Sequence, residues 1–180
     1  MIPVKVEKIS YHPSSRSYAV LLKEIGGDRL LPVVVGSFEA QSIALALEVV
    51  ETPRPLTHDL ICELIQGIDA TLKTVKISDL TDGVFYARLE LDGADFGFRS
   101  IDARPSDAIA VALRMNTPIL VAPDVIEEAG ITKEEIKVER TLKAPEFTLE
   151  DLQEKLQNAV EKEEYEIAAK LRDKINEKGS

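Results

Sequence analysis

The chain has 180 residues, of which 44% are hydrophobic and 30% charged, and its formal net charge is −10. This composition is typical of a soluble globular protein and excludes intrinsic disorder for the chain as a whole. There is no run of about 18 apolar residues, and the first residues, MIPVKVEKIS, lack the apolar core of a signal peptide. We therefore expect a cytoplasmic protein with no membrane span.

Acidic residues outnumber basic residues in both parts of the chain. Residues 1–140 hold 22 acids against 15 lysines and arginines, and residues 141–180 hold 10 against 7. Neither part has the basic surplus that drives unspecific binding to phosphate backbones. Binding to nucleic acid would therefore need a local arginine patch or bound cations. Cys62, the single cysteine, lies in the apolar stretch DLICELI and is most simply a buried apolar residue.

The first 50 residues predict three strands and one helix. The stretch PVKVEKIS alternates as a strand does, and SYAVLLKEIGGDRLLPVVVG contains two apolar strands joined at Gly26-Gly27-Asp28. Pro32 indicates an edge position or an irregularity in the second of these strands. Ser37 is the predicted N-cap of a helix in FEAQSIALALEVV. The apolar stripe of that helix is predicted to contain Ile43, Ala44, Leu47 and Val50.

The middle of the chain continues the mixture of strands and helices. Thr57 is predicted to cap a helix in HDLICELIQG that Gly67 closes. A three-stranded meander follows in ATLKTVKISDL, VFYARLELDG and ADFGFRSI, and then a helix in DARPSDAIAVALR with a proline at its start. A short strand in TPILVAP and a short helix in DVIEEAG come last. Because hairpins replace regular β-α-β alternation, the sequence predicts an α+β fold with a mixed, mostly antiparallel sheet and packed helices.

The composition changes after about residue 140. The stretch around KAPE is typical of a linker, and the segment from Thr148 onward is rich in Ala, Glu, Lys and Leu with no internal glycine or proline. Two apolar stripes in this segment predict a C-terminal antiparallel helical hairpin. We therefore expect an α+β domain at 1–140, a linker at 141–147 and a helical hairpin at 148–178.

Three predicted helices carry an acid in or near their first turn, namely Glu39, Asp59 and Asp107. For each acid alone the simplest role is a favourable interaction with the positive end of the helix, about 0.3–1 kcal/mol. The residues next to these acids suggest a chemical role in addition. His58, beside Asp59, is a candidate general acid or base.

The third helix start adds further candidates. Arg104 is suited to hold a phosphate through two parallel hydrogen bonds. We count Ser106 and Arg114 as further candidate substrate-binding residues, although Arg114 also suits the negative end of its helix. The candidate catalytic residues are His58, Asp59, Asp107 and Glu39.

Carboxylates are the ligands that Mg²⁺ and Mn²⁺ prefer. A divalent ion would also bridge acidic side chains to an anionic substrate. The candidate metal ligands are Glu39, Asp59, Asp102 and Asp107. The chain has no H-E-x-x-H, no Walker-type loop, no C-x-x-C pair and no G-x-S-x-G, so no single motif fixes the chemistry.

Four segments, LPVVVGSFEAQSIALAL, RPLTHDLICELI, FYARLEL and IDARPSDAIAVALRMNTPILV, resemble the bifunctional nuclease family of bacteria and plants, in the expected order. The resemblance covers roughly residues 1–140. It implies an α+β domain, a homo-oligomer that is a dimer or higher, and cleavage of DNA, RNA or both.

The C-terminal stretch LQEKLQNAVEKEEYEIAAKLRDKI resembles the UVR motif, a helical hairpin named for the UvrB and UvrC repair proteins. Tyr165 stands where that motif often has phenylalanine. The resemblance implies a protein partner bound through residues 148–178.

Two functions follow from these observations. The leading hypothesis is a metal-dependent nuclease with a protein-interaction tail. The alternative is a non-catalytic ligand-binding or partner-binding module in a stress or repair complex, in which Arg104 forms internal ion pairs with Asp102 and Asp107. The acidic charge favours the alternative, whereas the nuclease hypothesis requires that Asp59 and Asp107 meet around one cavity.

Overall fold

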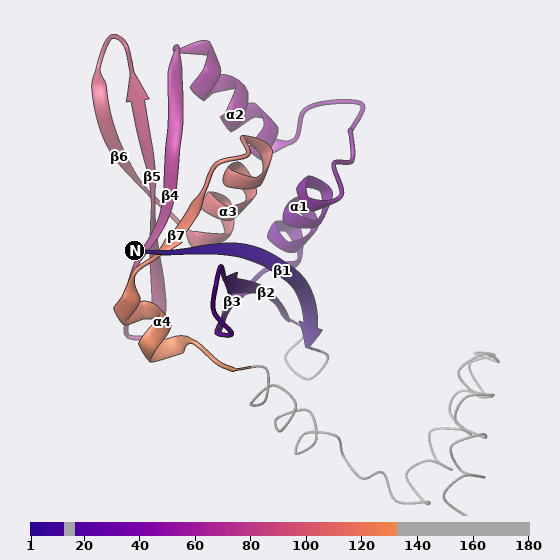
Figure 1. Cartoon of the computed structure of the whole chain (residues 1–180). Coiled ribbons are helices and arrows are strands. Elements are labelled where there is room, and N and C mark those ends of the chain that lie inside the picture. Colours follow the sequence, from indigo (N-terminus) through magenta and orange to yellow (C-terminus); the bar gives the residue numbers. More distant parts are fainter. Residues whose placement is uncertain (13–16, 133–180) are drawn as a thin grey trace, which may run out of the picture. The chain divides into compact units, whose positions relative to one another are not determined.

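A computed structural model describes residues 1–12 and 17–132 of the chain. The chain divides into two units after Ile136, and all described residues belong to the first. The described part combines a seven-stranded sheet with four helices, which confirms the predicted α+β class (Figure 1). The helical hairpin predicted at 148–178 lies outside the described residues. No helix in the described part is long and apolar enough to cross a membrane.

The sheet is mixed and mostly antiparallel, as predicted. Its strand order is β3-β2-β1-β7-β4-β5-β6, and within it the pair β4–β7 is parallel while the other pairs are antiparallel. The strands are β1 (Ile2–His12), β2 (Ser17–Glu24), β3 (Leu30–Val35), β4 (Ala70–Thr81), β5 (Val84–Gly93), β6 (Gly97–Ala103) and β7 (Ile119–Val121). The helices are α1 (Ser37–Leu47), α2 (Thr57–Gly67), α3 (Pro105–Arg114) and α4 (Pro123–Ala129).

The hairpin predicted at Gly26-Gly27-Asp28 is present, and so are the hairpins of the predicted meander. Gly26, with φ of +90°, lies in the β2–β3 turn, and Asp82 and Gly83, with φ of 52° and 76°, form the β4–β5 turn. Left-handed backbone of this kind favours glycine and tolerates aspartate. Pro32 lies in β3, an edge strand of the sheet, as a residue without a backbone N–H requires.

Both predicted N-caps are displaced by one residue. Ser37 and Thr57 are the first residues of α1 and α2, and the N-cap positions belong to Gly36 and Leu56, which make no side-chain cap. At α2 the capping interaction comes from inside the helix instead. Asp59 Oδ2 accepts a hydrogen bond from the backbone N–H of Leu56 at 2.7 Å. The side-chain hydrogen bond at this helix start therefore comes from an acid in the third helical position, and not from the predicted Thr57 hydroxyl.

The predicted apolar stripe of α1 is correct only in its first half. The helix ends at Leu47, which is 38% exposed, and Val50 beyond it is 47% exposed. Val49 has a φ of 52°, which ends the helical geometry. The buried residues of α1 are Ala40, Ser42 and Ile43.

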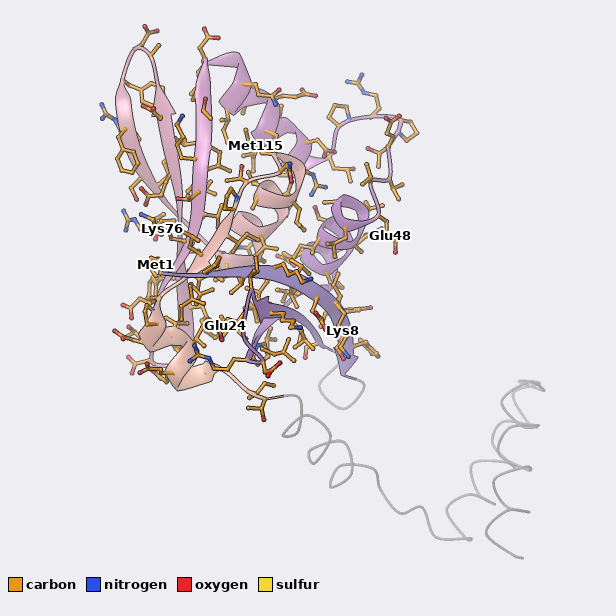
Figure 2. The ribbon with its side chains drawn as sticks, in the orientation of Figure 1. Met1, Lys8, Glu24, Glu48, Lys76 and Met115 are labelled. Carbon is orange, nitrogen blue, oxygen red and sulfur yellow. The ribbon has the colours of Figure 1, made fainter. Side chains whose placement is uncertain are left out.

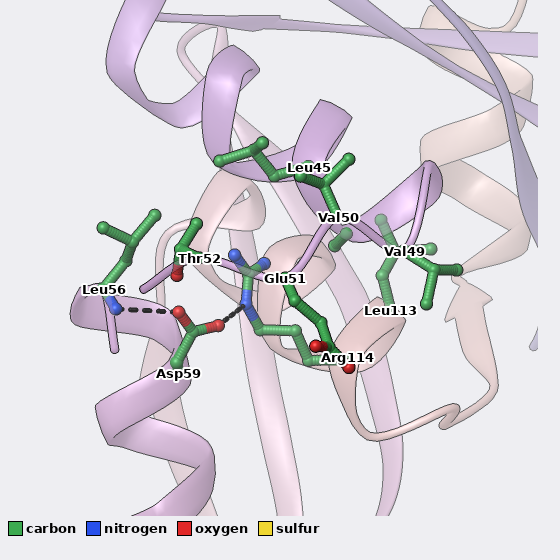
Figure 3. A pocket seen from close by; sticks show the side chains of 10 residues that line it. Leu45, Val49, Val50, Glu51, Thr52, Leu56, Asp59, Leu113 and Arg114 are labelled. Atoms are coloured by element: carbon green, nitrogen blue, oxygen red, sulfur yellow. Dashed lines mark hydrogen bonds and ion pairs between the residues drawn. The ribbon is translucent and has the colours of Figure 1, made fainter. Parts of the chain in front are cut away.

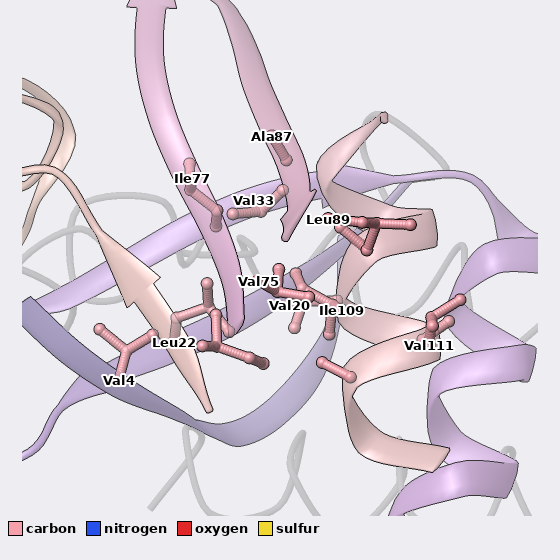
Figure 4. Packing of buried hydrophobic residues seen from close by; sticks show 14 of the residues in the cluster. Val4, Val20, Leu22, Val33, Val75, Ile77, Ala87, Leu89, Ile109 and Val111 are labelled. Carbon is pink, nitrogen blue, oxygen red and sulfur yellow. The ribbon is translucent and has the colours of Figure 1, made fainter. Parts of the chain in front are cut away.

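Helix α3 is the centre of the hydrophobic core. It contacts α1, α2, β3, β4 and β5, and Ile109 on its inner side is fully buried beside Val20 and Val75 of the sheet (Figure 4). Cys62 of α2 is buried in the same core, as predicted. Lys76 of β4, labelled in Figure 2, lies 3.7 Å from Glu90 of β5. The core thus fixes α3 against one face of the sheet.

We expect Ile109→Ala to lower the free energy of unfolding by about 2–5 kcal/mol, because it leaves a cavity where α3 meets the sheet. Urea denaturation followed by circular dichroism measures this change. The control Leu64→Ala removes an apolar side chain that is 59% exposed on α2 and should change stability by less than about 0.5 kcal/mol. Equal effects of the two variants would contradict the central role of α3.

Candidate functional site

The first turns of α1, α2 and α3 surround one hollow with a volume of about 530 Å³. Glu39 and Ser42 line it from α1, and His58 lines it from α2. Arg104, the N-cap of α3, and Asp107 in the first turn of α3 line the remaining side. Three helix starts that are far apart in the sequence therefore share one hollow. The nuclease hypothesis requires that Asp59 and Asp107 meet around one cavity, but only Asp107 lines this hollow, and Asp59 lines a neighbouring one.

A hydrogen-bonded relay runs through three of these side chains. Ser42 Oγ lies 2.8 Å from His58 Nδ1, and His58 Nε2 lies 3.1 Å from Asp107 Oδ1. Only 12% of the His58 side chain is exposed, and both of its ring nitrogens have a partner. The relay joins all three helices, because Ser42 belongs to α1, His58 to α2 and Asp107 to α3.

Arg104 holds the far end of the relay. Its Nε and Nη2 donate to the two oxygens of Asp107 at 2.8 and 3.0 Å, and its Nη1 lies 3.0 Å from Glu39 Oε1. The side chain is nonetheless 67% exposed. A guanidinium group has five N–H donors, so Arg104 keeps donors for an anion while it connects α1 to α3.

The surroundings of Asp107 favour its ionised form. Burial alone would raise the pKa of Asp107, but hydrogen bonds from Arg104 and His58 outweigh burial and hold this pKa below its ordinary value. At neutral pH Asp107 is therefore an ionised acceptor, and His58 Nε2 must carry a hydrogen. In the neutral imidazole Nδ1 is then the acceptor, so Ser42 Oγ–H donates to it.

A second ion pair lies beside the hollow (Figure 3). Arg114 Nε donates to Asp59 Oδ1 at 2.6 Å, and Arg114 Nη1 donates to the carbonyl oxygens of Ser42 and Ala110 at 3.2 and 3.0 Å. The Arg114 side chain is only 11% exposed. Hydrogen bonds from Arg114 and from the Leu56 N–H lower the pKa of Asp59. This pair lines a smaller hollow of about 220 Å³ next to the first.

The predicted site residues form two groups, and two further residues lie elsewhere. Glu39, His58, Arg104 and Asp107 meet at the larger hollow. Asp59 and Arg114 form the neighbouring pair, which is connected to the larger hollow through the backbone of α1 at Ser42.

The remaining two predicted residues lie apart from this group. Asp102 is exposed on β6 opposite Arg88 of β5 and does not line either hollow. Ser106 is buried in the first turn of α3.

The carboxylates do not form a metal site in this conformation. Among residues 1–12 and 17–132, no group of three His, Cys, Asp or Glu side chains is arranged to hold an ion. Arg104 contacts both Glu39 and Asp107, and both oxygens of Asp59 accept hydrogen bonds. A divalent ion would need Arg104 to leave its present position, and the Mg²⁺ or Mn²⁺ requirement stays a prediction.

Ser42 is the site residue that sequence reasoning missed. It lies five residues into α1, where a small polar residue is unremarkable, and no G-x-S-x-G surrounds it. One signal was available: a serine next to Ile43, close to the predicted buried stripe, has to find a polar partner. Its partner, His58, is 16 residues away, so the sequence did not reveal the pair.

The described domain thus brings a serine, a histidine, an aspartate and an exposed arginine together at one hollow. Comparison with known families is more specific. The model of the bifunctional nuclease domain matches residues 20–134, and the UvrB/uvrC motif matches residues 148–179. The chain therefore belongs to the bifunctional nuclease domain family.

Relatives agree with this assignment. An uncharacterized protein of Mycobacterium tuberculosis is 44% identical over 131 residues, which are 73% of this chain and 74% of the relative. Bifunctional nuclease 1 of Oryza sativa subsp. japonica is 31% identical over 121 residues, 66% of this chain and 37% of the relative. Bifunctional nuclease 2 of Arabidopsis thaliana is 27% identical over 187 residues, 92% and 56% respectively. The matched region thus covers only part of the plant relatives.

We expect Asp59→Asn to lower stability at neutral pH by about 1–3 kcal/mol, because it removes the charged partner of a buried guanidinium. Since the folded-state pKa of Asp59 is lowered, its contribution is present above the unfolded pKa and is lost as the pH falls through the folded pKa. Urea denaturation from pH 7 to pH 3 should therefore show a smaller loss of stability in the variant than in the unaltered protein.

Asp95→Asn is the matched control for this experiment. Asp95 is an exposed residue between β5 and β6, and its variant should keep the pH dependence of the unaltered protein. If Asp59→Asn keeps that pH dependence as well, the Asp59–Arg114 pair does not contribute to acid sensitivity as described.

Proposed function

We propose that this protein hydrolyses phosphodiester bonds in DNA, RNA or both, at the hollow between α1, α2 and α3. One observation carries the proposal: a titratable relay, Ser42–His58–Asp107, and an exposed guanidinium, Arg104, line the same hollow. Family membership supports it, because plant members bear the name bifunctional nuclease.

Each residue has a role that its position supports. Arg104 holds a phosphate oxygen through donors that are not used by Asp107 and Glu39. His58 accepts and returns a proton, and the Asp107 carboxylate orients the imidazole and stabilises its charged form. Asp59 and Arg114 position α1 against the start of α2 rather than touching the substrate.

The metal requirement is part of the proposal. A bound Mg²⁺ or Mn²⁺ would neutralise charge that develops on the phosphate. The predicted ligands are Glu39, Asp59, Asp102 and Asp107, of which only Glu39 and Asp107 line the larger hollow. These two carboxylates would have to exchange Arg104 for the ion.

The remaining parts of the proposal concern the setting of the domain. The match of residues 148–179 to the UvrB/uvrC motif supports a protein partner for the segment 148–178. A homo-oligomer and a cytoplasmic location stay predictions.

A second function is favoured by the closed ion-pair pattern. Asp59 and Asp107 each accept hydrogen bonds on both oxygens, and each pairs with an arginine. Such pairs also serve to fix helix positions in a protein without catalytic activity. In that case the domain binds a ligand or partner in a stress or repair complex, and the hollow is its binding site.

Cleavage of single-stranded DNA and RNA by the purified full-length protein separates the two functions. We expect cleavage by the unaltered protein and a loss of at least about 100-fold in Asp107→Asn, which deprives His58 of its ionised partner. Asp124→Asn is the matched control, because Asp124 is also a first-turn acid in a helix that begins with proline, and it should cleave normally. Rates are compared for variants with the same thermal unfolding midpoint.

The assay is run with Mg²⁺, with Mn²⁺ and with EDTA. Loss of cleavage in EDTA, with recovery when the ion is restored, supports the metal requirement, and undiminished cleavage in EDTA contradicts it. Cleavage at the same rate by Asp107→Asn, or no cleavage by the unaltered protein under any of these conditions, overturns the proposed nuclease function and favours the binding module.

A further inference from the structure

Both ring nitrogens of His58 are occupied, and this limits how it can take part in a reaction. Nε2 lies 3.1 Å from Asp107 Oδ1, and Nδ1 lies 2.8 Å from the Ser42 hydroxyl oxygen. In the neutral imidazole that carries its hydrogen on Nε2, Nδ1 accepts from the Ser42 hydroxyl. A water or a substrate cannot reach either nitrogen without displacing one of these partners. The group that passes a proton to His58 in this arrangement is therefore the Ser42 hydroxyl.

From this we infer that Ser42 is the nucleophile of the site and forms a covalent phosphoseryl intermediate. The inference rests on the proposed function for its substrate class, a phosphodiester. The relay has the hydrogen-bond distances of a nucleophile, a base and an orienting acid. Its two imidazole nitrogens have the reverse roles of those in chymotrypsin-type proteases, but such sites are recognised by geometry and roles rather than by position.

The surroundings of Ser42 fit this role. The residue is 8% exposed, and the small opening it has faces the 530 Å³ hollow, whose size is in the usual range for small-molecule sites. Arg104 lines the same hollow as Ser42 but contacts the Asp107 end of the relay, so the substrate has to extend from Arg104 across the hollow to Ser42. The Ser42 carbonyl accepts a hydrogen bond from Arg114, which holds this turn of α1 in place.

The reaction balances without another reagent. The Ser42 proton passes to His58 Nδ1, a bond forms between Oγ and phosphorus, and the bond from phosphorus to the leaving oxygen breaks. That oxygen takes the proton from Nδ1. Water then attacks the phosphoseryl group and gives a proton to Nδ1, and the released Ser42 oxygen recovers that proton. The net change is hydrolysis of one phosphodiester bond.

A fluorophosphonate probe tests the nucleophile independently of nuclease activity, because it forms the same bond between serine oxygen and phosphorus by displacing fluoride. We expect the full-length protein to gain one probe mass, which peptide mass spectrometry places on Ser42. Ser42→Ala should not be labelled, and His58→Gln should be labelled at least about 100-fold more slowly. Alanine is favoured inside a helix, so Ser42→Ala is expected to fold, and circular dichroism checks this.

Ser78→Ala is the matched control. Ser78 is a serine on β4 whose hydroxyl donates to the Tyr86 carbonyl, and its variant should be labelled like the unaltered protein. Absence of label on Ser42, or DNA and RNA cleavage by Ser42→Ala at the unaltered rate, overturns the inference. Labelling of Ser42 without nuclease activity supports the nucleophile and overturns the proposed substrate. Nuclease activity that persists in Ser42→Ala supports the proposed function and overturns Ser42 as the nucleophile.

Discussion

The contact between His58 and Asp107 is the interaction on which the rest of the site depends. The two residues are 49 positions apart, and their hydrogen bond connects the starts of α2 and α3. Through Asp107 the contact extends to Arg104 and Glu39, and through His58 it extends to Ser42. Without it, Ser42 and His58 would have no connection to Asp107, and the three helices would be joined at the site by the ion pairs of Arg104 and Arg114. With it, these groups form one network around one hollow.

The hydrophobic core makes this contact possible. Buried residues of α3, with Ile109 at their centre, fix the helix on the sheet (Figure 4), so its first turn has one position relative to α2. The parallel pair β4–β7 contributes as well, because β7 returns the chain after α3 to the middle of the sheet. A side chain that is held in one rotamer by packing loses little conformational entropy when it orders a substrate. The core therefore acts on function by fixing the relay before any substrate arrives.

Local sequence signals predicted most of the fold, because strands and helices differ in apolar period and turns need particular residues. They failed where a neighbouring element decides the outcome. Leu47 and Val50 fit a helical stripe, but the chain leaves α1 before it can bury them. Ser37 and Thr57 are good caps by type, but the α2 start uses Asp59 instead.

The site was predictable in its parts but not as a whole. First-turn acids and a histidine are visible in the sequence, so Glu39, His58 and Asp107 were identified. Their meeting depends on how α1 and α2 pack around α3, which no local pattern encodes. Ser42 was missed for the same reason, since only its distance from His58 distinguishes it from any other helical serine.

The two arginines of the site illustrate why burial, rather than residue type, separates a structural role from a chemical one. Arg114 is 11% exposed and uses its donors on Asp59 and on the carbonyl oxygens of Ser42 and Ala110. Arg104 is 67% exposed and keeps donors free of its two carboxylate partners. An enclosed guanidinium of this kind fixes the surrounding helices, while an exposed one next to a hollow can still bind an anion. Because the charge of Arg104 is already matched by Glu39 and Asp107, its unused N–H donors, rather than a local surplus of positive charge, are what it can offer a ligand.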